Sequence, residues 1–302
     1  MAPAKVLQIG YLPESAQQEL RGRYTVLESE HTVDASVEVV ITDGTCGVPT
    51  ELIETLPNLK LIAVNGAGTD AIDLTLTASR AIAVETTGSV LADDVADMAM
   101  ALLLAVSRQI LIADAYVRSG SWERAAPLPL ATSLSGKRMG IFGLGQIGQA
   151  IARRAEAFGM EVCYFNRTVR TDVYWPRATS LLDLAQQSDI LMSVVPGGDV
   201  TRHAIDFEVL RLLGPSGFVV NVGRGSVIHE AALAEAIGER IIAGAGLDVF
   251  EDEPRVHPSL LASPHVVLQP HRGSATAQTR ERMGQMVLGM IERFFLKQTH
   301  WI

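Results

Sequence analysis

A glycine-rich segment in the middle of the chain constrains the fold more than any other feature. Gly143, Gly145 and Gly148 have G-x-G-x-x-G spacing and come directly after a mostly apolar run at residues 137–142. Small and apolar side chains then recur at helical period through residue 155, and a second apolar run follows at residues 160–165. The pattern predicts a strand, a tight turn, a helix and a second strand, the phosphate-binding unit of a dinucleotide-binding domain.

The three glycines have different expected roles. The first permits the turn, the second lets the backbone approach a pyrophosphate, and the third lets the helix pack closely on the strand. The N-terminus of the helix then faces the anion. The alternative is a glycine-rich turn without a ligand, which the flanking strands and helix disfavour.

The end of the second strand indicates which dinucleotide binds. An NAD site usually has an acidic residue there, about 20 residues after the first glycine, to bond the ribose hydroxyls. No acid stands between Glu161 and Asp172 in this chain. The turn instead contains Asn166, Arg167, Thr168 and Arg170. Because guanidinium groups bind phosphate, we predict NADP(H), with NADH less favoured. The alternative is that these arginines are solvated loop charges.

The bulk composition excludes several classes of protein. A net charge of −9 argues against a nucleic-acid partner. The longest apolar run, residues 98–106, is too short to cross a membrane, and the N-terminus lacks the pattern of a signal peptide. Cys46 and Cys163 form no disulfide framework and fit a reducing compartment. We therefore expect a soluble, cytoplasmic protein without a membrane partner.

Short apolar runs alternate with helical patterns along the whole chain, which indicates parallel βα units and an α/β fold. The length of 302 residues suggests about two domains. We expect two Rossmann-like parallel-sheet domains, one flavodoxin-like and one dinucleotide-binding, with a cleft between them. The substrate domain is predicted at residues 1–94 and 276–302, and the dinucleotide-binding domain at residues 95–275. Residues 91–118 are expected to form one long helix, buried on several sides and partly at a subunit interface.

Three polar residues follow three predicted strands of the second domain. Arg224 comes after residues 218–222, Glu253 after residues 243–249, and His271 after residues 266–269. Ligands bind beyond the carboxyl ends of parallel strands, so these side chains are candidates for one site. The arginine would hold a carboxylate, the histidine would give a proton to a carbonyl oxygen, and the glutamate would orient the imidazole. This set suits reduction of a 2-oxo acid. Spacing alone leaves open that each is an ordinary loop or solvated residue.

The strings GLGQIG, NVGRGSVIHE, GAGLDVFEDEP and PHRGSAT, in this order, resemble the D-isomer-specific 2-hydroxyacid dehydrogenase family. The earlier segments LPNLKLIAVNGAGTDAID and VLADDVADMAMALLLAVSR are also similar to it. The resemblance implies that Arg224, Glu253 and His271 are catalytic, and that backbone amides at Ala67 and Gly68 meet the substrate carboxylate. It implies that Asp248 meets the nicotinamide carboxamide. Further cofactor contacts are expected at Gln146, Ile147, Val195, Pro196, Thr201, Val222, Gly223 and Gly273, and no metal is expected.

Within this family the chain is most similar to NADPH-dependent glyoxylate/hydroxypyruvate reductases and to hydroxyphenylpyruvate and 2-ketogluconate reductases. The segments DVADMAMALLLAVSR and YVRSGSW and the turn NRT carry this closer match. Ala92 and Ala67 depart from the residues that many relatives have, Thr and Val. The resemblance implies a homodimer that reduces a 2-oxo acid to the D-2-hydroxy acid. The alternatives are a corepressor-like protein that senses a dinucleotide and an NAD-dependent enzyme similar to phosphoglycerate dehydrogenase.

Overall fold

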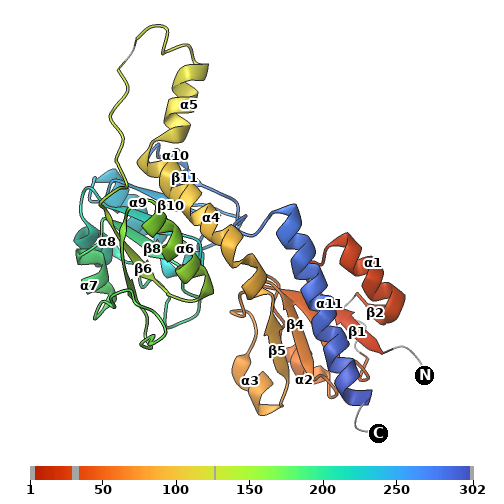
Figure 1. Ribbon diagram of the computed structural model, residues 1–302. Helices are drawn as coiled ribbons and strands as arrows, with labels where there is room; N and C mark the ends of the chain where they lie inside the picture. The colour runs from red at the N-terminus through yellow and green to blue at the C-terminus, as the bar shows by residue number, and fades with distance from the viewer. Residues whose placement is uncertain (1–3, 29–33, 126, 300–302) are drawn as a thin grey trace. The chain divides into compact units, whose positions relative to one another are not determined.

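The computed structural model describes residues 4–28, 34–125 and 127–299 (Figure 1). It divides into two compact units. One contains the residues up to Ala92 together with those from Ser274 onward, and the other is Asp93–Gly273. Each unit is built on its own parallel sheet. The predicted pair of parallel-sheet α/β domains is confirmed.

The sheet of the first unit has five parallel strands in the order β2-β1-β3-β4-β5. This is the flavodoxin-like order, with a reversal between β1 and β3. The strands are β1 (Lys5–Gln8), β2 (Thr25–Leu27), β3 (Val39–Asp43), β4 (Leu61–Asn65) and β5 (Ala83–Thr86). The helices are α1 (Glu14–Arg23), α2 (Thr50–Thr55), α3 (Leu74–Ser79) and α11 (Ala277–Thr299).

Alternating side chains of these strands cover both faces of the sheet. Ile41 packs with Val287 and Ile291 of α11 on one face, while Val40 packs with helix α2 on the other. A strand buried on both faces needs a continuous apolar run, which β3 and β4 have. Helix α11 therefore completes the core of a unit whose other elements lie at the opposite end of the chain (Figure 1).

The sheet of the second unit has six parallel strands in the order β11-β10-β9-β8-β6-β7. The order reverses between β6 and β8, which creates a crevice at their carboxyl ends. The strands are β6 (Arg138–Phe142), β7 (Glu161–Phe165), β8 (Ile190–Ser193), β9 (Phe218–Asn221), β10 (Gly244–Leu247) and β11 (Val266–Leu268). The helices after β6 are α6 (Gln146–Ala157), α7 (Leu181–Gln186), α8 (Phe207–Leu213), α9 (Glu230–Gly238) and α10 (Pro258–Ala262).

The expectation of one helix over residues 91–118 is wrong. The structure has α4 (Gly88–Ser107) and α5 (Ile110–Arg118), bent by 60° at a break where Gln109 is left-handed, with φ 53°. The carbonyl of Ser107 accepts a hydrogen bond from Thr132 N–H instead of continuing the helical ladder. The break therefore depends on a contact with a distant loop. Helix α4 is largely buried, whereas none of the residues of α5 is.

Among the described residues, no single helix is long and apolar enough to cross a membrane. The bent pair α4 and α5 reaches that length and composition only when both helices are taken together.

Three short elements were absent from the sequence expectations: β2, α3 and α10. Each is too short to display a full period of apolar residues. Local capping forms both helices. The carboxylate of Asp73 accepts hydrogen bonds from Thr75 N–H and Leu76 N–H at the start of α3, and His257 caps α10 in front of Pro258.

Candidate active site

The glycine turn connects β6 to α6, and its first and third glycines lie where the backbone leaves no room for a Cβ. Gly143 has φ 104°, and a Cβ there would lie 2.8 Å from a methyl carbon of Val195. A Cβ on Gly148 would lie 2.2 Å from the carbonyl oxygen of Gly143, so the helix packs directly on the turn. A Cβ on Gly145 would meet no atom within 4 Å. The open space therefore lies at the N-terminus of α6, where a pyrophosphate would be held; Gln146 and Ile147 begin this helix.

The glycine turn and the end of β7 are joined by Asn166. Its Oδ1 accepts a hydrogen bond of 2.6 Å from Leu144 N–H, and its backbone carbonyl accepts two from the Arg177 guanidinium. That guanidinium also lies over the ring of Phe165, 5.5 Å from its centroid. Asn166 thus bonds to the glycine turn from the end of β7, the place where NAD sites usually have an acidic residue.

The two arginines predicted to select NADP differ in their surroundings. Arg167 and its neighbour Thr168 are exposed. Arg170 instead forms a bidentate ion pair with Asp172 and donates to the carbonyl oxygen of Leu144 at 3.1 Å. Asp172, which had no predicted role at this turn, thus neutralises part of the charge of Arg170.

The remaining predicted cofactor residues of the central strands lie on two loops that touch. A Cβ on Gly223 would lie 2.6 Å from the carbonyl oxygen of Val195, so the loops after β8 and β9 are in close contact. The Thr201 hydroxyl donates to the carbonyl oxygen of Pro196 at 2.7 Å and closes the first loop. Val222 is buried beside them. These loops lie next to the glycine turn because Gly143 contacts Val194 and Val195.

The structure brings Glu253 and His271 into direct contact. The imidazole Nδ1 lies 2.8 Å from Glu253 Oε2, while Glu253 Oε1 accepts from Phe250 N–H at 3.0 Å. Burial alone would raise the pKa of Glu253, but the hydrogen bonds from His271 and Phe250 and the charge of Arg224 lower it below its ordinary value. The carboxylate is therefore ionised beside the imidazole at neutral pH.

Arg224 follows β9, and buried neighbours shape its loop. Asn221 donates from Nδ2 to the backbone carbonyl of Arg224 at 2.8 Å and accepts from Gly223 N–H at 3.1 Å. A Cβ on Gly225 would lie 1.8 Å from the carbonyl carbon of Phe250, which brings this loop against the segment that leads to Glu253. Asn221 was not among the predicted site residues, although it opens the NVGRG string.

Asp248 holds the loop that carries His271. Its two carboxylate oxygens accept from the backbone N–H groups of Arg272 and Gly273, each at 2.7 Å, and its carbonyl oxygen accepts from His271 N–H. His271 has a left-handed backbone, with φ 53°, that these bonds stabilise. Burial raises the pKa of Asp248 above its ordinary value, against the opposing hydrogen bonds. Asp248 and Gly273 thus have structural partners beyond any cofactor contact.

The predicted substrate loop belongs to the first unit. Ala67 and Gly68 follow β4 at the carboxyl edge of its sheet, and Ala67 is exposed. At the same edge the carboxylate of Asp43 accepts from the backbone N–H groups of Tyr11, Thr45 and Cys46. These three amides are therefore engaged within the protein, and the substrate contact at Ala67 and Gly68 stays a prediction.

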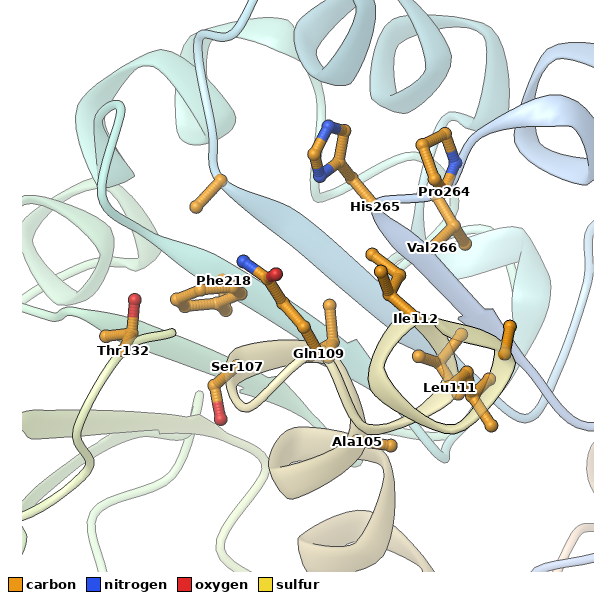
Figure 2. Close-up of a pocket in the computed structure, with 14 residues that line it drawn as sticks. Ala105, Ser107, Gln109, Leu111, Ile112, Thr132, Phe218, Pro264, His265 and Val266 are labelled. Atoms are coloured by element: carbon orange, nitrogen blue, oxygen red, sulfur yellow. The ribbon is translucent and has the colours of Figure 1, made fainter. Parts of the chain in front are cut away.

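A separate pocket of about 390 Å³ in the second unit contains none of the predicted site residues. Figure 2 shows it between the end of α4, helix α5 and strand β11, lined by Phe218, Leu111, Ile112 and Val266 among others. Its lining is mainly apolar, without the charged groups that a 2-oxo acid needs. In the described part of the chain, no cluster of three or more His, Cys, Asp or Glu side chains could hold a metal ion.

Comparisons with known proteins agree with this geometry. Residues 100–273 match the NAD-binding domain model of the D-isomer-specific 2-hydroxyacid dehydrogenases. The chain is 46% identical over 276 residues to the 2-ketogluconate reductase of Gluconobacter oxydans, covering 91% of this chain and 89% of the relative. It is 43% identical over 260 residues to a glyoxylate/hydroxypyruvate reductase of Arabidopsis thaliana, covering 86% of this chain and 83% of that protein.

Solved structures extend the similarity to the whole fold. The structure of an NADPH-dependent glyoxylate/hydroxypyruvate reductase from Sinorhizobium meliloti, in complex with NADP and malonate, matches with a TM-score of 0.90 at 38% identity. The match covers 98% of this chain and 94% of that one. The family model, the identities and the coverage together establish that this chain belongs to the D-isomer-specific 2-hydroxyacid dehydrogenase family.

Proposed function

We propose that the protein reduces a 2-oxo acid, of the glyoxylate, hydroxypyruvate or sugar-acid kind, to the D-2-hydroxy acid with NADPH. One observation carries the proposal: an ionised carboxylate on Glu253 contacts the imidazole of His271, with the charge of Arg224 beside them. The three residues follow β9, β10 and β11 of the sheet whose strand β6 leads into the glycine turn. The relatives named above are reductases of such acids.

Each of the three side chains has its own task. The Arg224 guanidinium binds the substrate carboxylate and polarises the carbonyl oxygen. Glu253 engages Nδ1 of His271 and leaves Nε2 to donate a proton to that oxygen. NADPH, when bound, supplies the hydride that reduces the carbonyl carbon. Asp248 fixes the backbone of the His271 loop, and its contact with the nicotinamide carboxamide is the role that the family resemblance implies.

The described residues fit a dinucleotide phosphate. The open space at Gly145 and the N-terminus of α6 suit the pyrophosphate. Arg167, Thr168 and Arg170 stand where an acidic residue would repel a 2′-phosphate, and the Sinorhizobium meliloti relative was crystallised with NADP. We therefore assign the adenosine 2′-phosphate to this turn, with NADH as the weaker cofactor.

The two units have different tasks in this proposal. Residues 93–273 bind the dinucleotide and carry the three catalytic side chains. The discontinuous unit, with Ala67 and Gly68, supplies backbone amides to the substrate carboxylate. The unit boundaries support this division, since one unit contains both the glycine turn and His271.

The protein also acts as a homodimer in this proposal. Helix α5 has no buried residue, and large apolar side chains on and after it are exposed, up to 69% for Trp122 and 96% for Leu130. The apolar pocket of Figure 2 lies at the same helix. Exposed apolar surface of this kind is typical of an interface. Light scattering of the purified protein tests the dimer, and Leu130→Glu should shift it toward monomer.

We place the protein in the cytoplasm. Both cysteines, Cys46 and Cys163, are free, as a reducing compartment requires. Fractionation of the native source, with detection of the protein in the soluble cell fraction, tests the assignment.

The decisive experiment is a substrate panel. The purified protein is mixed with NADPH or NADH and with glyoxylate, hydroxypyruvate, hydroxyphenylpyruvate or 2-ketogluconate, and the loss of reduced-cofactor absorbance is recorded. Turnover with NADPH supports the proposal. Dinucleotide binding without turnover of any 2-oxo acid would favour the corepressor-like alternative, and a preference for NADH with phosphohydroxypyruvate would favour the phosphoglycerate-dehydrogenase-like one.

A further inference from the structure

The ion pair between Arg170 and Asp172 lies at the turn where the proposed function puts the adenosine 2′-phosphate. Arg170 Nε and Nη2 donate to the two oxygens of Asp172 at 2.7 and 2.5 Å. This is the fork-like contact that a guanidinium makes with a carboxylate or a phosphate. The carboxylate therefore occupies an edge of Arg170 that a phosphate would use.

The rest of Arg170 is fixed at the glycine turn. Its Nη1 donates to the carbonyl oxygen of Leu144 at 3.1 Å. The hydroxyl of Tyr164, a buried residue of β7, contacts the backbone of Arg170 at both its N–H and its carbonyl oxygen. The two Tyr164 contacts hold the backbone of Arg170, and the Leu144 bond holds one end of its guanidinium, each without Asp172. Asp172 is thus not required to bring Arg170 to the turn.

We propose that Asp172 is a specificity-determining residue that competes with the 2′-phosphate of NADPH for Arg170 and so limits the preference for NADPH over NADH. The inference rests on the proposed function, in which this turn receives the 2′-phosphate. A 2′-phosphate that binds Arg170 must displace the Asp172 carboxylate from that guanidinium. The displacement weakens the binding of NADPH and leaves the binding of NADH, which has no phosphate there, nearly unaffected.

The charge state of Asp172 keeps this competition present at every working pH. Hydrogen bonding to Arg170 lowers the pKa of Asp172 to about 2. Arg167 differs, because no hydrogen bond or ion pair of its guanidinium occurs among the described residues. Arg167 therefore offers a whole positive charge to the phosphate, and Arg170 a partly neutralised one.

The test compares Asp172→Asn, Arg170→Gln and the double variant with the wild type. Asn keeps the size of the side chain and removes its charge, and Asp172 is 60% exposed, so the variant should fold. Glu239→Gln is the matched control, because it changes the net charge equally at an exposed site after α9. For each protein the ratio of kcat/KM with NADPH to that with NADH is measured, together with the dissociation constants of NADP⁺ and NAD⁺ by calorimetry.

Asp172→Asn should raise the ratio roughly three- to tenfold, as expected for removing one nearby exposed carboxylate. The change should come from a higher kcat/KM with NADPH and a lower dissociation constant of NADP⁺. Glu239→Gln should leave the ratio unchanged, and Asp172→Asn should have no effect when Arg170 is already Gln. An unchanged or lower ratio for Asp172→Asn overturns the inference. An equal rise with and without Arg170 also overturns it, because Asp172 would then act without that arginine.

Failure of the proposed function gives a different pattern. If the wild type prefers NADH, the turn is not a phosphate site. The same conclusion follows if adenosine 2′-phosphate, added as an inhibitor, fails to compete with NADPH. If the wild type prefers NADPH and Asp172→Asn lowers that preference, the phosphate site stands and only the proposed competition is wrong. Asp172 would then be a residue that orients Arg170.

Discussion

The imidazole Nδ1 of His271 lies 2.8 Å from Oε2 of Glu253, and the second oxygen of that carboxylate is held by Phe250 N–H. One nitrogen of the ring is therefore engaged by the protein, and Nε2 is the nitrogen left for a substrate. The side chains are 40% and 30% exposed, so the pair is accessible at the end of strand β11. Substitutions of His271 and of Glu253 should therefore have different effects on the reaction.

His271→Ala should lower kcat by about 10²–10⁴-fold, because the group that protonates the carbonyl oxygen is lost. NADPH binding should change little, since the glycine turn lies on other strands. Single-turnover kinetics and NADPH titration measure the two effects. His257→Asn, which keeps a side-chain cap for α10, serves as the control. Full activity of His271→Ala would mean that the proton comes from another group.

Glu253→Gln should move the acidic-to-neutral limb of the pH profile for reduction to lower pH. The lowered pKa of Glu253 keeps its carboxylate ionised through the neutral range, where its charge favours the protonated imidazole. Gln removes the negative charge that stabilises a positively charged ring. Initial rates across pH measure the shift, and Asp252→Asn, at the adjacent carboxylate, should leave the profile in place.

Arg224→Lys should raise the KM for the 2-oxo acid and also lower kcat. An ammonium group cannot reproduce the planar, two-pronged contact with a carboxylate and a carbonyl oxygen. Steady-state kinetics at saturating NADPH separate the two constants. Arg211→Lys in the last turn of α8 provides the comparison. A variant with wild-type constants would contradict the assigned role of Arg224.

Arg167→Ala should raise the KM for NADPH and leave that for NADH nearly constant. The lost charge-assisted contact contributes roughly 1.5–3 kcal/mol, about one to two orders of magnitude in affinity. Kinetics with both cofactors measure the change, and Arg153→Ala, exposed on α6, removes an equal charge elsewhere. If the KM values for NADPH and NADH rise together, Arg167 does not bind the 2′-phosphate that distinguishes the two cofactors.

Gly145→Ala and Gly148→Ala should fail in different ways. The methyl group at Gly145 enters open space, so stability should be retained while the KM for NADPH rises. The methyl group at Gly148 meets the Gly143 carbonyl oxygen at 2.2 Å, which should cost about 1–3 kcal/mol of unfolding free energy. Thermal melting and NADP⁺ titration of both variants test this. Equal melting temperatures would show that α6 adjusts to the extra atom.

The sequence by itself determined the parallel α/β architecture, the position of the glycine turn, and the strand ends that carry Arg224, Glu253 and His271. These features depend on local patterns: apolar runs buried on both faces of a sheet, glycines at positions that exclude a Cβ, and polar residues directly after strands. Each pattern lies within a few residues and can be recognised without knowing the fold.

Only the three-dimensional structure decided the rest, because those features depend on which side chains and backbone groups meet in space. The long helix breaks at Gln109 because the Ser107 carbonyl is bound by Thr132. The Asp248 carboxylate accepts a hydrogen bond from the N–H of Gly273, 25 residues later, and so fixes the loop that carries His271. Asp172 neutralises part of the charge of Arg170 although only one residue separates them, and a string of residue types does not reveal which carboxylate a guanidinium will contact.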